Sequence, residues 1–334
     1  MRKRIAVALL IGALCSSCKT DHRAIMVGCK KFAEQRILQH IVAGHLRENN
    51  FKVEVAEPEG SNLEAHRALL DDDIDLYPEY TGTAFSLVLN HCCIDKPPGP
   101  VDVGKPLGPA DAAGQYRVIQ NRVLEAVRAE YRGMDLEWLD PLGFDNSWAI
   151  VGGRSAPTTL SAAVRPEGLA ASTSETPLGY RLVVGPDFLE RPDGFRALMA
   201  AYPIRWAEAP EVVDKVDISD LCATNQGPTE GGAKQARQAS AGKLLAVGKT
   251  TPLKDGCHAV ADDRQAFLPY EACLVVRKAT LEAEPRLRRV LLKLNRLIKI
   301  EDMMMLNRAA DQCRAAPHCY DDVAASWLKT HPRP

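Results

Sequence analysis

The sequence predicts an α/β fold with a largely parallel sheet and about two domains, on three observations. Between residues 24 and 77 the apolar pattern alternates as strand, helix, strand, helix, strand, which is typical of βαβ units. The length of 334 residues fits two domains of ordinary size. The composition changes in the middle of the chain, where residues 158–176 are rich in Ala, Ser and Thr. The formal net charge of −1 gives no reason to expect nucleic acid or an anionic membrane as a partner.

The first 18 residues have the pattern of a targeting segment. Basic residues come first, and the apolar run over residues 5–14 is too short to span a bilayer. The segment resembles a bacterial lipoprotein signal that is cleaved before Cys18, with lipid attached to the Cys18 sulfur. Cys15 stands where such signals usually carry Leu, so secretion without a lipid is the alternative. The expectation is a membrane-anchored lipoprotein of the periplasm or cell envelope.

The chain has 10 cysteines, which fits an exported protein. Without Cys15 and Cys18 an even number remains, and an even number in an oxidising compartment favours disulfides. Cys313 and Cys319 lie close enough in sequence to close a small loop at the start of the last helix. A metal site is the rival interpretation of the His-Cys-Cys sequence at residues 91–93. No C-x-x-C pair occurs in the mature part, so no metal is expected.

The first part of the mature chain is expected to form an opening βαβ sheet. The apolar patterns predict strands at 24–28, 51–55 and 74–77, and helices at 33–48 and 61–70. Ser61 and Glu64 form a capping-box pattern at the start of the second helix. Ligands bind such sheets at the carboxyl ends of the strands. Two loops therefore matter: residues 28–32, and the Pro-Glu-Tyr-Thr-Gly-Thr loop at 78–83, which leads into a helix at 84–89.

The rest of the chain shows the same kinds of pattern, interrupted twice. Residues 91–113 are rich in Pro and Gly, and residues 226–256 lack strong periodicity, so both are expected to be surface insertions. Around them the patterns predict strands at 136–139, 149–151, 181–184, 216–218 and 272–276, and helices at 115–131, 191–202, 285–300, 302–311 and 321–329.

Two stretches carry a resemblance to a known family: VGCKKFAEQRIL at residues 27–38 and IDLYPEYTGTA at residues 74–84. They resemble the quaternary-amine-binding substrate-binding proteins of osmoprotectant ABC importers, the ProX/OpuAC-like family of glycine betaine, choline and carnitine binders. Four further motifs occur in the order that this family uses: PLGFDNSWAI at 141–150, RPDGF at 191–195, FLPYEA at 267–272 and LNRAAD at 306–311. The resemblance covers residues 24–329, with both insertions extra.

The resemblance implies a two-lobed α/β clamp, a type II periplasmic-binding-protein-like fold with the ligand in the cleft between the lobes. The chain would cross to the second lobe near Trp148 and return near residues 273–276. The implied division is a signal peptide at 1–18, a tether at 19–23, a first lobe of 24–145 plus 275–334 with the insertion 91–113, and a second lobe of 146–274 with the insertion at about 226–256.

In this family a box of aromatic rings holds the ligand's quaternary ammonium group. Such a group has no N–H to donate and is weakly hydrated, so aromatic faces bind it by cation–π attraction and by burying its methyl groups. Matched motif by motif, the resemblance implies box positions at Tyr80, Trp148 and Tyr270, with Trp148 standing where the family usually has tyrosine. Asn146 lies two residues before Trp148, where some members have an acidic residue near the cation.

A carboxylate on the ligand needs cations, hydroxyls or backbone N–H groups. The resemblance places such contacts at Lys30, Thr83 and Arg191. Thr83 could also cap the helix that follows it.

The departure from the family lies at the remaining wall of the box. The family's strand end resembles D-A-Y-S-T-D-G, whereas residues 220–226 here read Asp-Leu-Cys-Ala-Thr-Asn-Gln, with Cys222 in place of the tyrosine. Cys222 could also form a disulfide with Cys257. Because Cys222 replaces the tyrosine, one wall of the box is either missing or supplied by another ring: Trp206, Tyr202 or Tyr180.

The expected function is that of the extracytoplasmic solute-binding component of an ABC importer. It would capture a quaternary-ammonium osmolyte such as glycine betaine, choline or carnitine by hinge closure and deliver it, as a monomer, to the permease and ATPase subunits. No cofactor and no chemistry on the ligand are expected. One alternative is a binding module of the same fold with a changed or lost ligand, such as a sensor. The other is a hydrolase that uses Cys222 or Cys29 with His258, although no G-x-S-x-G motif is present.

Overall fold

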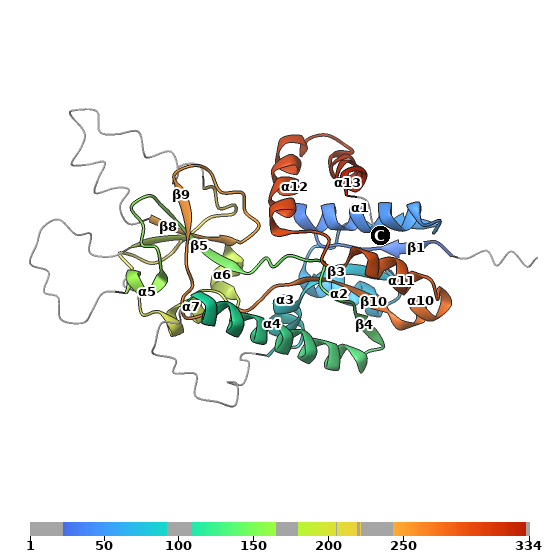
Figure 1. Cartoon of the computed structure of the whole chain (residues 1–334), viewed down its shortest axis with the longest axis horizontal. Coiled ribbons are helices and arrows are strands. Elements are labelled where there is room, and N and C mark those ends of the chain that lie inside the picture. The colour runs from blue at the N-terminus through green and yellow to red at the C-terminus, as the bar shows by residue number, and fades with distance from the viewer. Residues whose placement is uncertain are drawn as a thin grey trace, which may run out of the picture.

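The computed structural model describes residues 23–91, 109–164, 180–204, 206–218, 221 and 243–331. These residues form two lobes, each built around a five-stranded sheet, and Figure 1 shows the lobes side by side with two chain segments running between them. The signal segment, Cys18, Cys222 and parts of both predicted insertions lie outside the described residues. Within the described ranges, no helix is both long and apolar enough to cross a membrane.

The sheet of the first lobe has the strand order β2-β1-β3-β10-β4. Its strands are β1 (Ile25–Val27), β2 (Val53–Val55), β3 (Leu76–Tyr80), β4 (Leu136–Trp138) and β10 (Ala272–Arg277). β1 is parallel to β2 and to β3, as the alternation of strands and helices predicts, whereas β10 runs antiparallel to β3 and β4. Because β10 is inserted between β3 and β4, this sheet is complete only when the chain returns from the second lobe.

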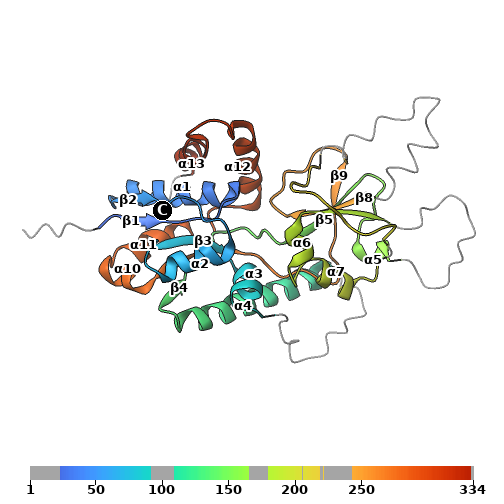
Figure 2. The same cartoon turned by 180° about the vertical axis from the view of Figure 1, so that it is seen from behind.

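Helices cover both faces of the first sheet (Figures 1 and 2). One face carries α1 (Ala33–Glu48), α10 (Lys278–Ala283), α11 (Leu287–Leu291), η2 (Leu292–Leu294), α12 (Ile300–Cys313) and α13 (Cys319–Thr330). The other face carries α2 (Asn62–Leu70), α3 (Thr81–Thr83), η1 (Ala84–Val88) and α4 (Pro109–Arg132). Ile37 and Trp327 share the core cluster of the first face. Leu69, Tyr77 and Tyr131 belong to the cluster of the second. With both faces covered, the central strand β3 is buried along its whole length rather than at alternate residues.

The sheet of the second lobe has the order β7-β6-β8-β5-β9. Its strands are β5 (Trp148–Gly153), β6 (Arg181–Val184), β7 (Glu211–Val212), β8 (Lys243–Gly248) and β9 (Cys257–Val260), and its helices are α5 (Leu160–Ala163), α6 (Pro186–Glu190) and α7 (Phe195–Ala201). Leu244 of β8 packs with Phe188 and Leu198 of the helices in one core cluster.

The two segments that connect the lobes hydrogen-bond to each other. The outward segment follows β4 and leads into β5, and the return segment follows β9 and leads into β10. The N–H of Asn146 donates to the carbonyl of Tyr270 at 3.0 Å, and an antiparallel bridge pairs Asp145 with Glu271. Residues on these two segments therefore lie close together although more than a hundred positions separate them in the sequence.

Local patterns predict the long helix and its neighbour correctly. The expected helix at 33–48 is confirmed as α1. Ser61 Oγ accepts a hydrogen bond from the N–H of Glu64 at 3.2 Å, so the expected cap of α2 is confirmed as well. The start of α2 is set by a side chain within its first turn, which is the range over which sequence patterns act.

The predicted loop at residues 78–83 is wrong. Residues 78–80 continue β3, and the helical turn α3 begins at Thr81 and passes into the π-helix η1. Pro78 lacks an N–H and is usually excluded from central strands. It is tolerated here because β1 pairs with β3 only through Val27 and Leu76, so Pro78 lies beyond the end of β1.

The predicted second insertion is wrong over residues 243–248. This segment is β8, the central strand of the second sheet, whose four inner residues are buried. A short apolar run between polar stretches cannot be told from a loop by periodicity. The strand expected at 216–218 is not formed, and the nearest strand is the two-residue β7 at the sheet edge. The implied lobe border at 274/275 falls inside β10, which lies wholly in the first sheet.

The helix predicted at 285–300 is broken into shorter pieces. α10 ends at Ala283, just before Pro285, and α11 begins at Leu287. After η2 the chain becomes irregular, with a positive φ of 52° at Arg296, whose N–H donates to the carbonyl of Pro141 at 3.0 Å. Contact with the outward crossing segment thus replaces helical hydrogen bonds there.

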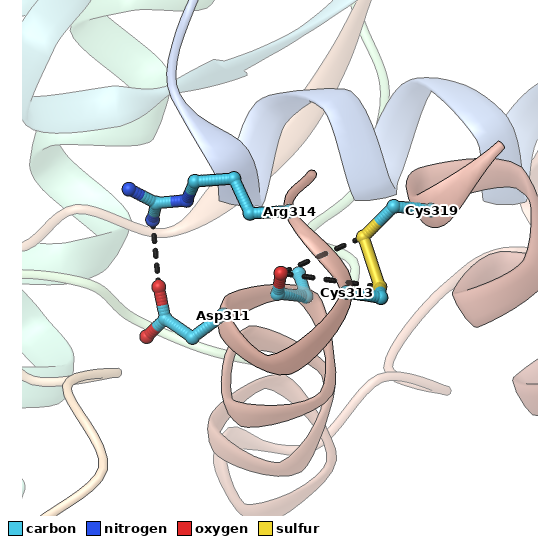
Figure 3. The surroundings of a disulfide bond; sticks show 5 residues. Asp311, Cys313, Arg314 and Cys319 are labelled. Atoms are coloured by element: carbon cyan, nitrogen blue, oxygen red, sulfur yellow. Dashed lines mark hydrogen bonds and ion pairs between the residues drawn. A yellow bond between two sulfur atoms is a disulfide. The ribbon is translucent and has the colours of Figure 1, made fainter. Parts of the chain in front are cut away.

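A disulfide joins Cys313 at the end of α12 to Cys319 at the start of α13, as expected from their spacing (Figure 3). Cys257 is also disulfide-bonded. Its partner is not among the described cysteines, because Cys29 and Cys273 are free thiols. The pairing of Cys257 with Cys222 therefore stays a prediction.

We predict that Leu244→Ala lowers the free energy of unfolding by about 2 to 5 kcal/mol, because it removes a fully buried side chain from the centre of β8. Val212→Ala in the same lobe is the matched control: this side chain is 51 % exposed, so its truncation should change stability by about 0.5 kcal/mol or less. Chemical denaturation of both variants measures the difference. Equal stability of the two would contradict a core position for β8.

Candidate ligand-binding site

A cavity of about 530 Å³ lies between the two lobes. Its walls combine aromatic rings, cations and small polar residues, namely Lys30, Lys31, Phe32, Gly60, Ser61, Asn62, Tyr80, Thr83, Asn146, Trp148, Asp187, Arg191, Gly248 and Tyr270. Every predicted ligand-binding residue that the structure describes is in this set. Cys222 lies outside the described residues, so the fourth wall of the box stays a prediction.

Strand pairing brings the two box tyrosines together. Tyr80 ends β3 and pairs with Ala272 of β10, so Tyr270 lies just beyond the same end of the sheet. Gly82 permits this approach, because a Cβ there would lie 2.5 Å from Cε2 of Tyr270 and 2.7 Å from the carbonyl oxygen of Pro269. A side chain at position 82 would therefore displace the Tyr270 ring.

Two further rings complete the aromatic lining. Trp148 begins β5 in the second lobe and packs edge-on against Phe188, with ring centroids 5.1 Å apart. Phe32 stacks against Tyr80 at 6.2 Å and is 45 % exposed. The predicted set omitted Phe32. It lies in the loop after β1, which the sequence marks as a ligand-binding loop, and its position at the end of that loop was the available signal.

Lys30 is buried and paired with a buried carboxylate. Its Nζ contacts Oε1 of Glu79, a residue with no exposed surface. The same Nζ lies 5.4 Å from the centre of the Tyr80 ring. Burial lowers the pKa of Lys30, and the contact with Glu79 opposes that shift. Lys30 therefore lines the cavity as a cation that is already paired with the carboxylate of Glu79.

Arg191 takes part in a polar cluster that joins the lobes. Its Nε donates to Oδ1 of Asp193 at 3.1 Å, and the Tyr270 hydroxyl contacts both of these side chains. Ser86 of the first lobe donates to Oδ2 of Asp193 at 3.1 Å. The guanidinium of Arg191 lies 5.1 Å from the centre of the Tyr270 ring. The cluster therefore holds one box tyrosine and links it to the second lobe.

Glu34 on α1 is the centre of a second cluster behind Tyr80, and the predicted set did not include it. Its carboxylate accepts hydrogen bonds from the Tyr80 hydroxyl (2.5 Å), Asn146 Nδ2 (3.0 Å), Thr250 Oγ1 (2.6 Å) and Asn307 Nδ2 (2.9 Å). Burial raises the pKa of Glu34, and these hydrogen bonds oppose the shift. Asn146 lines the cavity as predicted, with its amide held by this cluster.

The described residues do not form the nucleophilic pair of Cys29 and His258. Cys29 is buried after β1 and its Sγ lies 3.1 Å from Gln39 Oε1, and burial raises its pKa to about 12, so the thiolate form is scarce. His258 belongs to β9 in the second lobe, where its Nε2 lies 3.2 Å from the carbonyl of Pro157. Among the described residues no group of His, Cys, Asp and Glu has the arrangement of a metal site.

Comparison with known proteins agrees with this geometry. The family model that describes the substrate-binding domain of the ABC-type glycine betaine transport system matches residues 23–330. The chain belongs to this family. The resemblance read from the motifs is therefore confirmed, and the match spans both lobes.

Relatives of this substrate-binding protein include a glycine-betaine-binding protein of Pseudomonas aeruginosa (strain PAO1), 27 % identical over 96 % of this chain and 94 % of the relative. An ergothioneine transport permease/ergothioneine-binding protein of Helicobacter pylori (strain G27) is 24 % identical over 89 % of this chain, which spans 46 % of that longer protein. The crystal structure of a glycine betaine/carnitine/choline ABC transporter superposes with a TM-score of 0.63 at 19 % identity, covering 92 % of this chain and 98 % of the other.

The family and the shared fold confirm a type II periplasmic-binding-protein-like clamp with a solute-binding role in ABC import. Substrate-binding proteins of this family work outside the cytoplasm and present small ligands to permease components. The cavity lies where a clamp of this kind holds its solute, between the lobes.

We predict that Gly82→Ala weakens ligand binding by about tenfold or more, because the added methyl group must displace the Tyr270 ring or the Pro269 carbonyl. Gly114→Ala in α4 is the matched control, since a Cβ there meets no atom within 4 Å. Isothermal titration of both variants with the tightest ligand of the wild type measures the effect. Equal affinities would contradict the close approach of these two loops.

A second prediction concerns Glu271, on the return segment beside the cavity. Burial, then repulsion from Asp145, raises the pKa of this carboxyl from 4.5 to about 7. Protonated Glu271 therefore contributes stability that is fully present below pH 4.5 and is lost as the pH rises through about 7. In Glu271→Gln, the decrease in the free energy of unfolding with rising pH should be smaller than in wild type by about 1 to 2 kcal/mol. This figure allows for the partial exposure of Glu271.

Chemical denaturation between pH 5 and pH 8 tests the Glu271 prediction. The stability difference between Glu271→Gln and wild type should grow in favour of the variant as the pH rises. Glu282→Gln, at an exposed position of α10, serves as the control. A constant difference across this pH range would show that Glu271 does not titrate as expected.

Proposed function

We propose that this protein captures a small quaternary-ammonium osmolyte, such as glycine betaine, choline or carnitine, and delivers it to the permease of an ABC importer. The observation that carries the proposal is one cavity lined by Phe32, Tyr80, Trp148 and Tyr270. A trimethylammonium group can be bound by ring faces and methyl burial but not by hydrogen bonds. One ring contributes about 0.5 to 2 kcal/mol, so several converging rings are needed for useful affinity.

The polar groups of the cavity suit a ligand that also carries a carboxylate. Lys30 and Arg191 offer cationic donors, and Thr83 offers a hydroxyl, all within the same lining. Both cations already have buried acidic partners, Glu79 and Asp193, so a carboxylate would share them rather than neutralise them alone. Betaines, which carry a carboxylate, and cations without a carboxylate, such as choline, are therefore both candidate ligands.

The size of the cavity leaves room for larger betaines. A volume of about 530 Å³ lies in the range of pockets for drug-sized ligands. Ergothioneine, the ligand in the name of the Helicobacter relative, is a larger betaine whose α-carbon carries a trimethylammonium group, a carboxylate and a side chain that ends in a ring. Cys222 in place of an aromatic wall is compatible with such an enlarged ligand. A larger betaine is thus the second candidate class.

The sequence motifs support further features of the proposal. The signal pattern supports export and a lipid anchor on Cys18. We propose a monomer that performs no chemistry on its ligand, in keeping with a family of transport substrate-binding domains. The permease and ATPase of the importer are its partners.

Calorimetric titration with glycine betaine, choline, carnitine, proline betaine and ergothioneine tests this proposal. The wild type should bind at least one of them with micromolar or tighter affinity. Tyr80→Ala should weaken that binding by about tenfold or more, because it removes one wall of the box. Tyr320→Ala is the control, since Tyr320 lies on α13 against Arg36, away from the cavity. Failure of the wild type to bind any of the five would refute a quaternary-ammonium receptor.

A further inference from the structure

Three carboxylates are buried around the cavity, and two of them have a cation as partner. Glu79 is paired with Lys30, and Asp193 is paired with Arg191. Glu34 is 4 % exposed, and its hydrogen-bond partners are all uncharged. Among the residues that the structure describes, no Lys, Arg or His forms an ion pair with Glu34. Of these three carboxylates, Glu34 is therefore the one without a cationic partner in the described part of the chain.

The partners of Glu34 favour its ionised form. A carboxylate offers about four acceptor sites and has no proton to donate, and here four groups donate to it. The orientation of Asn146 is set independently, because its Oδ1 accepts the N–H of Thr250 at 3.2 Å, which turns Nδ2 toward Glu34. The donors come from β3, the outward crossing segment, the turn after β8 and α12, so the charge is held at one point between the lobes.

This charge acts on the cavity through Tyr80. The Tyr80 hydroxyl donates to Glu34 Oε1 at 2.5 Å, while its ring forms part of the cavity wall. A phenol that donates to a carboxylate carries more negative charge on its ring, which strengthens the attraction of the ring face for a cation. Because Glu34 is buried, its carboxylate also attracts a cation directly, at a range of several ångströms.

We propose that Glu34 is the counter-charge of the ligand's ammonium group, and that it acts through the Tyr80 ring to favour a cation over an uncharged group of the same shape. An unpaired buried carboxylate is unfavourable, and a bound cation relieves this cost. Glu34 is thus a specificity-determining residue that does not touch the ligand. The inference rests on the proposed function, because it requires a cationic ligand in the box.

Ligand pairs that differ only in nitrogen or carbon at the quaternary atom test the proposal. Choline is paired with 3,3-dimethylbutan-1-ol, and glycine betaine with 3,3-dimethylbutanoate. The affinities of wild type and Glu34→Gln for all four compounds are measured by titration, or by competition where binding is weak. Glu34→Gln should lower the affinity for the nitrogen compounds by about tenfold or more, and change the affinity for the carbon compounds by about twofold or less.

Thr250→Val separates the charge from the structural role of the cluster. It removes one donor from Glu34 but keeps the carboxylate, so it should shift both members of each pair alike and leave the nitrogen-to-carbon ratio unchanged. An equal loss for both members in Glu34→Gln would mean that Glu34 only holds the lobes in place, and would overturn the proposal. An unchanged ratio with unchanged affinities would also overturn it.

Tyr80→Phe provides a second test if Glu34→Gln does not fold. It keeps the ring and removes the hydroxyl that links the ring to Glu34, so the nitrogen-to-carbon ratio should fall, by a smaller factor than in Glu34→Gln. If the wild type binds none of the five quaternary-ammonium ligands titrated above, the proposed function and this inference fail together. If it binds one of them, and neither variant lowers the affinity ratio between that ligand and its carbon isostere, the inference alone fails.

Discussion

The antiparallel pairing of β10 with β3 is the constraint on which the site depends. It sets Ala272 opposite Tyr80, and the N–H of Thr81 donates to the carbonyl of Glu271 at 3.1 Å. Residues from the first and last thirds of the chain thereby form one edge of the cavity. The same pairing closes the first sheet, so the helices that follow β10 can cover α1. The binding site and the first lobe are therefore completed by the same strand.

Two buried polar clusters then tie the second lobe to this edge. Asp193 of the second lobe meets Ser86 and Tyr270 of the first, and Glu34 of the first meets Thr250 of the second. Each cluster ends on a box tyrosine, because Asp193 contacts the hydroxyl of Tyr270 and Glu34 accepts that of Tyr80. Buried polar networks orient their members strongly in a low dielectric. The positions of the rings consequently depend on how the lobes meet.

Much of the site could be predicted from the sequence, because its residues lie in short motifs beside strand ends. Tyr80 ends β3, Thr83 lies in the helical turn that follows, and Tyr270 lies two residues before β10, so local patterns mark them. Glu34 and Asp193 also lie inside the motifs VGCKKFAEQRIL and RPDGF, but nothing in their local pattern distinguishes them as site residues. A glutamate on an amphipathic helix has the pattern of a solvated residue, and only its burial against Tyr80 and Thr250 gives it a role. The strand β8 was missed for a related reason, since its apolar run is too short to identify without its neighbours.

The sequence by itself determined the class of fold, the ends of helix α1 and the motifs that hold the aromatic and cationic residues of the box. These features depend on interactions within a few residues, such as capping, helical periodicity and the chemistry of the ring. Only the tertiary structure decided which charges around the cavity are neutralised. Lys30 and Arg191 have acidic partners, whereas Glu34 has neutral ones. Charge pairing depends on distance in space, and segments far apart in the sequence meet only in the folded clamp.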